Sequence, residues 1–127
     1  MLKIHHIAIY VNNFDEMLMF YCNVLGFTET QRIYHGNGNV KMVKLSISEQ
    51  QVLELFNFGY INKEIKHKFV NWGYMHVGFS VEDFSVLKKK LLDNRINIID
   101  ETESGNDGLK HLFVKDPEKN LIEFTEL

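Results

Sequence analysis

The stretch His6-Ile7-Ala8-Ile9-Tyr10-Val11-Asn12-Asn13-Phe14 returns later in the chain as His76-Val77-Gly78-Phe79-Ser80-Val81-Glu82-Asp83-Phe84, at an offset of 76 − 6 = 70 residues. A second pair, Val52-Leu53-Glu54-Leu55-Phe56 and Leu121-Ile122-Glu123-Phe124-Thr125, repeats at 123 − 54 = 69 residues. Each half of the chain therefore opens on a histidine and closes on a glutamate. Self-similarity at one spacing is typical of a duplicated structural unit, so the repeat predicts one supersecondary unit written twice.

Length and composition are those of an ordinary globular protein. A chain of 127 residues, 45% hydrophobic and 24% charged, is long enough for a single domain over residues 1–127 without a structural metal. The net charge of −3 provides no basic face, so we expect no nucleic-acid partner. The lone Cys22 and the absence of a long apolar run predict a cytoplasmic protein that does not bind membranes.

Hydrophobic periodicity predicts the same order of elements in both halves. In the first unit, residues 1–57, we expect a strand at 3–11, a helix between Asn13 and Gly26, and strands at 27–34, 40–47 and 52–57. In the second, residues 74–127, we expect a strand at 74–81, a helix capped by Asp83, and strands at 96–101, 109–115 and 121–126. The predicted fold class is α+β, with two tandem β-α-β-β-β units forming a curved mixed sheet around a metal-binding cavity.

The connector at 58–73 lacks a clear period and is rich in aromatic residues: Phe58, Tyr60, Phe69, Trp72 and, just after it, Tyr74. Two interpretations are open. These rings either pack the connector onto the sheet or line the mouth of a substrate cavity.

Strand alternation decides where the repeated polar residues point. In each opening strand the histidine shares a face with small or polar residues, and the opposite face is apolar and must meet the helix. His6 and His76 therefore face the cavity. Glu54 and Glu123 lie within apolar strands, where an ionised carboxylate is costly unless it is paired or coordinated.

A single such histidine is more often a hydrogen-bonded core residue, and a single such glutamate a surface charge. The recurrence of both at matching positions favours a metal site with His6, Glu54, His76 and Glu123 as ligands. This nitrogen and oxygen donor set suits Ni, Co, Fe, Mn or Zn rather than calcium.

The chain resembles the vicinal oxygen chelate superfamily, also called the glyoxalase, bleomycin-resistance and dioxygenase fold. The resemblance covers nearly the whole sequence and is carried by His6-Ile7-Ala8-Ile9, Phe20-Tyr21, Leu25-Gly26-Phe27, Leu53-Glu54-Leu55, the strand beginning at His76, Asp116-Pro117 and Asn120-Leu121-Ile122-Glu123. The complete His, Glu, His, Glu set is similar to that of glyoxalase I, the lactoylglutathione lyase. The short chain is closer to the bacterial nickel or cobalt type than to the longer zinc type.

This resemblance implies a metal-dependent lyase whose substrate is the hemithioacetal of a 2-oxoaldehyde, such as methylglyoxal, with glutathione or another thiol. Two substrate oxygens would chelate the metal, which stabilises an enediolate while a glutamate moves a proton between adjacent carbons. Glu123 is the first choice for this base and Glu54 the second. The resemblance also implies a homodimer.

Some positions depart from the pattern. Tyr10 stands where bacterial glyoxalases I carry an arginine for the glutathione carboxylate, and Arg32 or Lys44 would replace it only if their strands face the cavity; exposed strand charges are the more ordinary interpretation. His111 is either an extra acid or base or a hydrogen-bonded strand residue, and we expect the Asp-Pro-Glu-Lys turn at 116–119 to be a structural variation.

Two alternative functions are kept open. One is another enzyme of the same fold, a fosfomycin-type thiol transferase or a dioxygenase, although these resemble sites with three protein ligands and Glu54 argues against them. The other is a drug-sequestering binding protein, which needs an aromatic cavity but no metal. One fold hosts many functions, so the fold does not choose among them.

Overall fold

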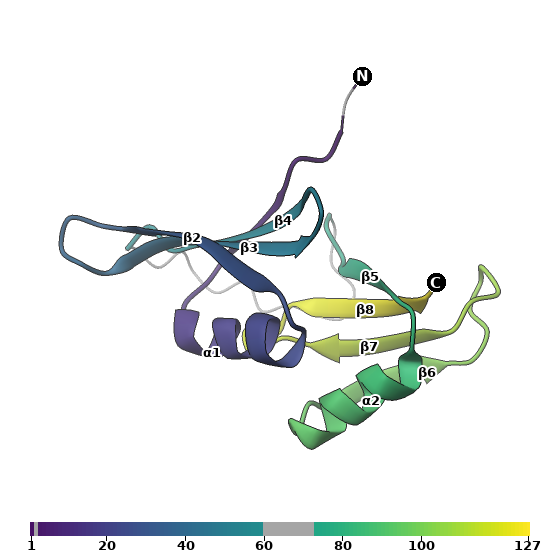
Figure 1. Cartoon of the computed structure of the whole chain (residues 1–127). Helices are drawn as coiled ribbons and strands as arrows, with labels where there is room; N and C mark the ends of the chain where they lie inside the picture. Colours follow the sequence, from purple (N-terminus) through teal and green to yellow (C-terminus); the bar gives the residue numbers. More distant parts are fainter. Residues whose placement is uncertain (2, 60–72) are drawn as a thin grey trace. The chain divides into compact units, whose positions relative to one another are not determined.

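The computed structural model describes residues 1, 3–59 and 73–127, and it divides into two compact units, Met1–Glu64 and Ile65–Leu127 (Figure 1). The first unit contains β1 (Ile7–Tyr10), α1 (Phe14–Leu18) continued by the π-helix η1 (Met19–Val24), β2 (Thr28–Tyr34), β3 (Val40–Ser48) and β4 (Gln51–Phe56). The second contains β5 (Val77–Val81), α2 (Phe84–Asp93), β6 (Ile98–Thr102), β7 (His111–Lys115) and β8 (Leu121–Glu126). The predicted β-α-β-β-β order is confirmed in both units.

Each unit forms its own four-stranded mixed sheet. The strand orders are β1-β4-β3-β2 and β5-β8-β7-β6, which are the same order at equivalent positions of the repeat. The parallel neighbours are β1 with β4 in the first sheet and β5 with β8 in the second. The other neighbouring strands pair antiparallel. The parallel register sets Ala8 opposite Glu54 and Gly78 opposite Glu123. That the two units enclose a common cavity stays a prediction.

Both helices begin where the sequence predicts, and the first also ends where predicted. The side chain of Asn13 accepts a hydrogen bond from the backbone N–H of Glu16, and Asp83 does the same for α2. The first helix ends at Gly26, whose φ is +83°, in the left-handed region that glycine tolerates. Arg95 ends α2 at the matching position, 95 − 26 = 69 residues later, with φ +58°. A non-glycine residue thus carries backbone strain at the same structural position.

The apolar core follows from strand alternation. In β1, Ile7 and Ile9 are half-buried while Ala8 and Tyr10 are exposed, and Val11 beyond the strand is buried. The buried face of the first sheet and the buried face of its helix consist of large side chains, namely Val43, Leu45, Leu53, Leu55, Met17, Phe20, Tyr21 and Val24. Figure 1 shows a helix beside each sheet. The predicted division into an apolar and a polar face is confirmed.

Most of the connector, residues 60–72, lies outside the described residues, and with it the predictions for Tyr60, Phe69 and Trp72. Within the described part, Phe58 stacks on Phe56 with ring centroids 5.5 Å apart, whereas Tyr74 is fully exposed. Among the described helices, none has the length and apolarity needed to cross a membrane.

Candidate metal centre

The first unit brings His6 and Glu54 together. His6 immediately precedes β1, and Glu54 lies in the middle of the adjacent parallel strand β4. His6 Nε2 is 3.5 Å from Glu54 Oε2, and Lys44 Nζ, on the other side in β3, is 3.6 Å from Glu54 Oε1. Only 8% of Glu54 is exposed, so the carboxylate is nearly buried but has a cationic or polar group near each oxygen.

The second unit repeats the pair with closer contacts. His76 immediately precedes β5, and its Nε2 is 2.7 Å from Oε2 of Glu123 in β8. The His76 ring also packs edge to face on Phe113, which occupies the position of Lys44 in the repeat (113 − 44 = 69). In both units, therefore, one carboxylate oxygen faces the repeated histidine.

The spacing of these donors suits a divalent cation. Two donor atoms at right angles, each about 2.1 Å from a metal ion, lie about 3.0 Å apart. The observed separations of 3.5 Å and 2.7 Å lie on either side of that value. Within residues 1, 3–59 and 73–127, no three His, Cys, Asp or Glu side chains gather closely enough to hold a metal. Each unit thus supplies a pair, and the four-ligand set of the sequence prediction needs both units.

Glu123 also has a second histidine partner. His111 Nδ1 lies 2.5 Å from Glu123 Oε1, and His111 Nε2 lies 2.7 Å from Asp107 Oδ1. The Asp107 carboxylate, and after it Glu123, raises the pKa of His111 above its ordinary value by hydrogen bonding, against the opposing effect of burial. The His111 side chain and the backbone N–H of Leu109 in turn lower the pKa of Asp107.

A family model of the Glyoxalase/Bleomycin resistance protein/Dioxygenase superfamily matches residues 3–124 of this chain. The chain belongs to this superfamily. The uncharacterized protein YaeR of Escherichia coli (strain K12) is 33% identical over 81 residues, which are 64% of this chain and 62%, less than two thirds, of the relative. The uncharacterized protein YwkD of Bacillus subtilis (strain 168) is 27% identical over 124 residues, covering 98% of this chain and 96% of the relative.

Solved structures of glyoxalase proteins share the fold over nearly the full chain. A glyoxalase family protein from Enterococcus faecalis matches with a TM-score of 0.79 at 24% identity, covering 98% of this chain and 97% of the other. The trypanothione-dependent glyoxalase I of Leishmania major matches with a TM-score of 0.73 at 26% identity (99% and 87%). The fosfomycin resistance protein FosX of Listeria monocytogenes matches with a TM-score of 0.73 at 11% identity, covering 100% of this chain and 94% of the other. The tandem fold is thereby confirmed.

The structure distinguishes Lys44 from Arg32, the two cations that the sequence offers in place of an arginine at position 10. Lys44 lies beside Glu54 on the polar face, half-buried, so it is not an exposed strand charge. Arg32 forms a two-point ion pair with Glu29, at 2.5 Å and 3.1 Å. The hydroxyl of Tyr10 accepts a hydrogen bond from the backbone N–H of Phe58 at 3.2 Å, which ties β1 to the start of the connector.

From the sequence, His111 was identified as a candidate, but two residues that contact it, Asp107 and Thr125, were missed. Thr125 Oγ1 lies 3.2 Å from His111 Nδ1. A comparison of the two units position by position would have found Thr125, since a 69-residue offset places His111 on Met42 and Thr125 on Phe56. The signal is that an apolar pair in the first unit is replaced by a polar pair in the second. Asp107 could not have been found in this way, because it lies in a loop whose conformation the sequence does not reveal.

Proposed function

We propose that this chain is a divalent-metal-dependent lyase of the glyoxalase I kind, which isomerises the hemithioacetal of a 2-oxoaldehyde and a thiol. One observation carries the proposal: a His–Glu pair with donor atoms 3.5 Å or 2.7 Å apart occurs at the same position of both repeats. His6, Glu54, His76 and Glu123 would together hold one ion, Ni or Co by preference and Zn, Fe or Mn as further possibilities. The pairs meet either within one chain or across a homodimer.

The burial of Glu54 supports a functional rather than a structural role. The neighbours of this carboxylate in its strand, Leu53 and Leu55, are apolar and buried. A hydrophobic residue at this position would stabilise the fold at least as well as a buried charge. The side-chain nitrogens of His6 and Lys44 lie 3.5 Å and 3.6 Å from the oxygens of Glu54, beyond ordinary hydrogen-bond distance. A cation shared with His6 would offset the desolvation of this carboxylate.

The isomerisation needs one base that returns the proton it removes. When bound, the metal ion would act as a Lewis acid on the two neighbouring oxygens of the substrate. Glu123 would accept the proton from the carbon that bears sulfur and deliver it to the adjacent carbon, so one C–H bond breaks and another forms. The hydroxyl proton on the first carbon would pass to the carbonyl oxygen of the second, and a 2-hydroxy thioester results without an external oxidant. Glu54 is the second candidate for the base.

The thiol is the open part of this proposal, because Tyr10 replaces the arginine expected for glutathione. The test is to purify the full chain without a metal-chelating tag, measure its bound metal, remove it, and restore Ni or Co. Methylglyoxal is then supplied with glutathione and with several other thiols. We expect activity that is lost with the metal and restored by Ni or Co, with at least one thiol.

Four ligand variants sharpen the test: His6→Gln, Glu54→Gln, His76→Gln and Glu123→Gln. Each should weaken metal binding and abolish turnover, whereas His35→Gln, which removes a histidine bonded to the backbone carbonyl of Asn57, should retain both. If no hemithioacetal is isomerised by native or reconstituted protein, the proposal is wrong. A metal-bound protein that instead joins a thiol to fosfomycin, or cleaves an aromatic ring, would be one of the alternative enzymes of this fold.

A further inference from the structure

The second unit contains a hydrogen-bonded chain of side chains that ends on Glu123. His111 Nε2 lies 2.7 Å from Asp107 Oδ1, and the other ring nitrogen, Nδ1, lies 2.5 Å from Glu123 Oε1. Thr125 lies 3.2 Å from that same nitrogen. The remaining carboxylate oxygen, Oε2, is the one that faces His76 at 2.7 Å. The two oxygens of Glu123 are thus bound on opposite sides by two histidines.

The first unit serves as an internal control for the role of this chain of side chains. At the 69-residue offset, Met42 takes the place of His111 and Phe56 that of Thr125. The strand pairing is equivalent, because Met42 lies opposite Phe56 and His111 opposite Thr125. A four-stranded sheet of the same order therefore forms without polar residues at the positions of His111 and Thr125, which we call the polar set. The polar set is not needed to build the sheet.

The loop before β7 also accommodates the His111 ring closely. A Cβ atom placed on Gly105 would lie 2.5 Å from His111 Cδ2 and 2.8 Å from Nε2, closer than side chains tolerate. Only 14% of the His111 side chain is exposed. The ring is therefore held by Asp107 on one edge, by Glu123 on the other, and by the backbone of the loop.

We propose that His111, itself oriented by Asp107, is a positioning residue for Glu123: it binds Oε1 and so keeps Oε2 directed toward His76 and the metal. This inference rests on the proposed function and assigns a residue to that site. The terminal torsion of a glutamate is broad and has no strong preference of its own, so the carboxylate needs a partner to hold its plane. The corresponding oxygen of Glu54, Oε1, has a longer contact, to Lys44 at 3.6 Å, so within the described part of the chain the Glu54 carboxylate is the less tightly held of the two.

The test is cobalt binding to the full-length, metal-free protein, followed by visible absorption. Loss of a side chain that orients a metal ligand costs about 10–100-fold in affinity, and we expect this for His111→Ala. His111→Gln retains an N–H donor and should lose less. Asp107→Asn should lose about 2–5-fold, the effect of an exposed ion pair.

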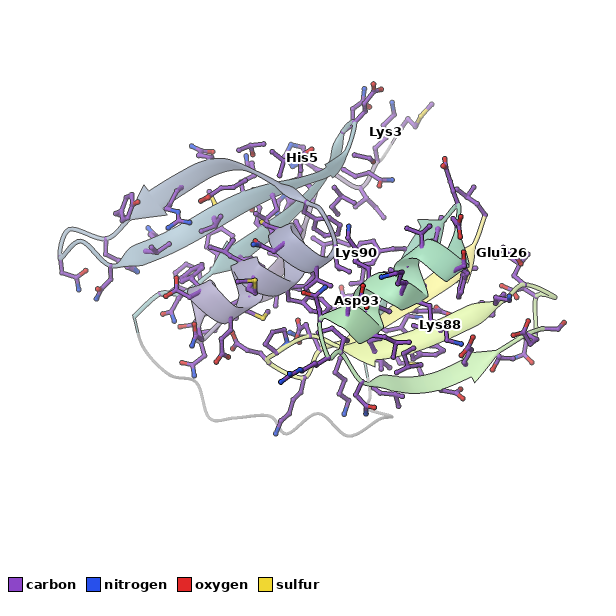
Figure 2. The ribbon with its side chains drawn as sticks, turned by 60° about the horizontal axis from the view of Figure 1, so that its bottom comes forward. Lys3, His5, Lys88, Lys90, Asp93 and Glu126 are labelled. Carbon is purple, nitrogen blue, oxygen red and sulfur yellow. The ribbon has the colours of Figure 1, made fainter. Side chains whose placement is uncertain are left out.

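Two controls distinguish positioning from general stability. Asp93→Asn removes another exposed aspartate, which lies at the end of α2 (Figure 2). Asp93 pairs with Lys89 in the same i,i+4 relation as Asp107 and His111. The Asp93→Asn variant should bind cobalt as the parent protein does. In a Glu123→Ala background, His111→Ala should cause no further loss, because the carboxylate that His111 positions is already gone.

The outcomes separate this inference from the function on which it rests. If the parent protein binds cobalt through Glu123 and His111→Ala and Asp107→Asn bind it equally well, the inference is wrong and the proposed function stands. An undiminished effect of His111→Ala in the Glu123→Ala background also overturns it. A parent protein that binds no cobalt and isomerises no hemithioacetal overturns both.

Discussion

Gly105→Ala tests whether the loop packs against the His111 ring as closely as the structure shows. The φ of Gly105 lies outside the left-handed region, so alanine is allowed by the backbone and only contact matters. To reach an ordinary separation of 3.4 Å from the new Cβ, His111 Cδ2 would have to move 3.4 − 2.5 = 0.9 Å and Nε2 3.4 − 2.8 = 0.6 Å. The ring cannot pivot freely, because both of its nitrogens are hydrogen-bonded.

The ring must therefore shift by 0.6–0.9 Å within a site where both of its nitrogens already have partners. Overpacking of this kind costs about 1–3 kcal/mol, and we expect the lower end because the loop is at the surface. For a chain of this size each kcal/mol lowers Tm by roughly 3–5 °C.

Gly36→Ala is the matched control, since Gly36 occupies the same position of the repeat (105 − 36 = 69). Its Cβ would meet no heavy atom within 4 Å, and its φ also lies outside the left-handed region. Thermal unfolding followed by circular dichroism should show no loss for Gly36→Ala, or a gain of about 0.4–1 kcal/mol. Equal Tm values for the two variants, or a penalty for Gly105→Ala that persists in a His111→Ala background, would refute the reasoning.

Three further predictions concern stability. Arg95→Gly should raise the free energy of unfolding by about 0.5–1 kcal/mol in urea denaturation, because it relieves the left-handed strain that Gly26 avoids at the matching position; a lower value would contradict this. The Ser85 hydroxyl and the backbone N–H of Val86 lower the pKa of Asp83, so its contribution to stability should be complete above about pH 4 and lost as the pH falls through the lowered pKa. The Tm of the parent should therefore fall more steeply than that of Asp83→Asn on acidification, and parallel curves would show that the cap has no such role. Leu112→Ala, at a fully buried position of β7, should cost about 2–5 kcal/mol, whereas Leu92→Ala, 57% exposed, should cost less than about 1 kcal/mol.

Pattern recognition reached the ligand candidates because strand faces are encoded locally. Successive side chains alternate across a strand, so the exposed Ala8 and the half-buried Ile7 and Ile9 could be assigned without knowledge of the partner strand. Helix limits were local in the same way, since the Asn13 cap and the Gly26 end depend on a few adjacent residues. The duplication then allowed each assignment to be checked against its copy.

The sequence could not show which further side chains contact Glu54 and His111. Whether Lys44 or Arg32 approaches Glu54 depends on the register of β3 between two neighbouring strands, and a shift by one residue would move every side chain to the other face. Asp107 meets His111 only because the loop before β7 folds back, with the backbone N–H of Gly105 donating to the carbonyl of Leu109.

The sequence by itself determined the duplicated β-α-β-β-β unit, the faces of its strands and the four histidine and glutamate candidates, because these follow from periodicity and local capping. Only the tertiary structure decided that His6 pairs with Glu54 and His76 with Glu123 within each unit, and that a second histidine, His111, binds Glu123. Those contacts join residues from 12 to 48 positions apart, since 123 − 111 = 12 and 54 − 6 = 48. Such contacts depend on strand order and register, which the folded sheet as a whole establishes.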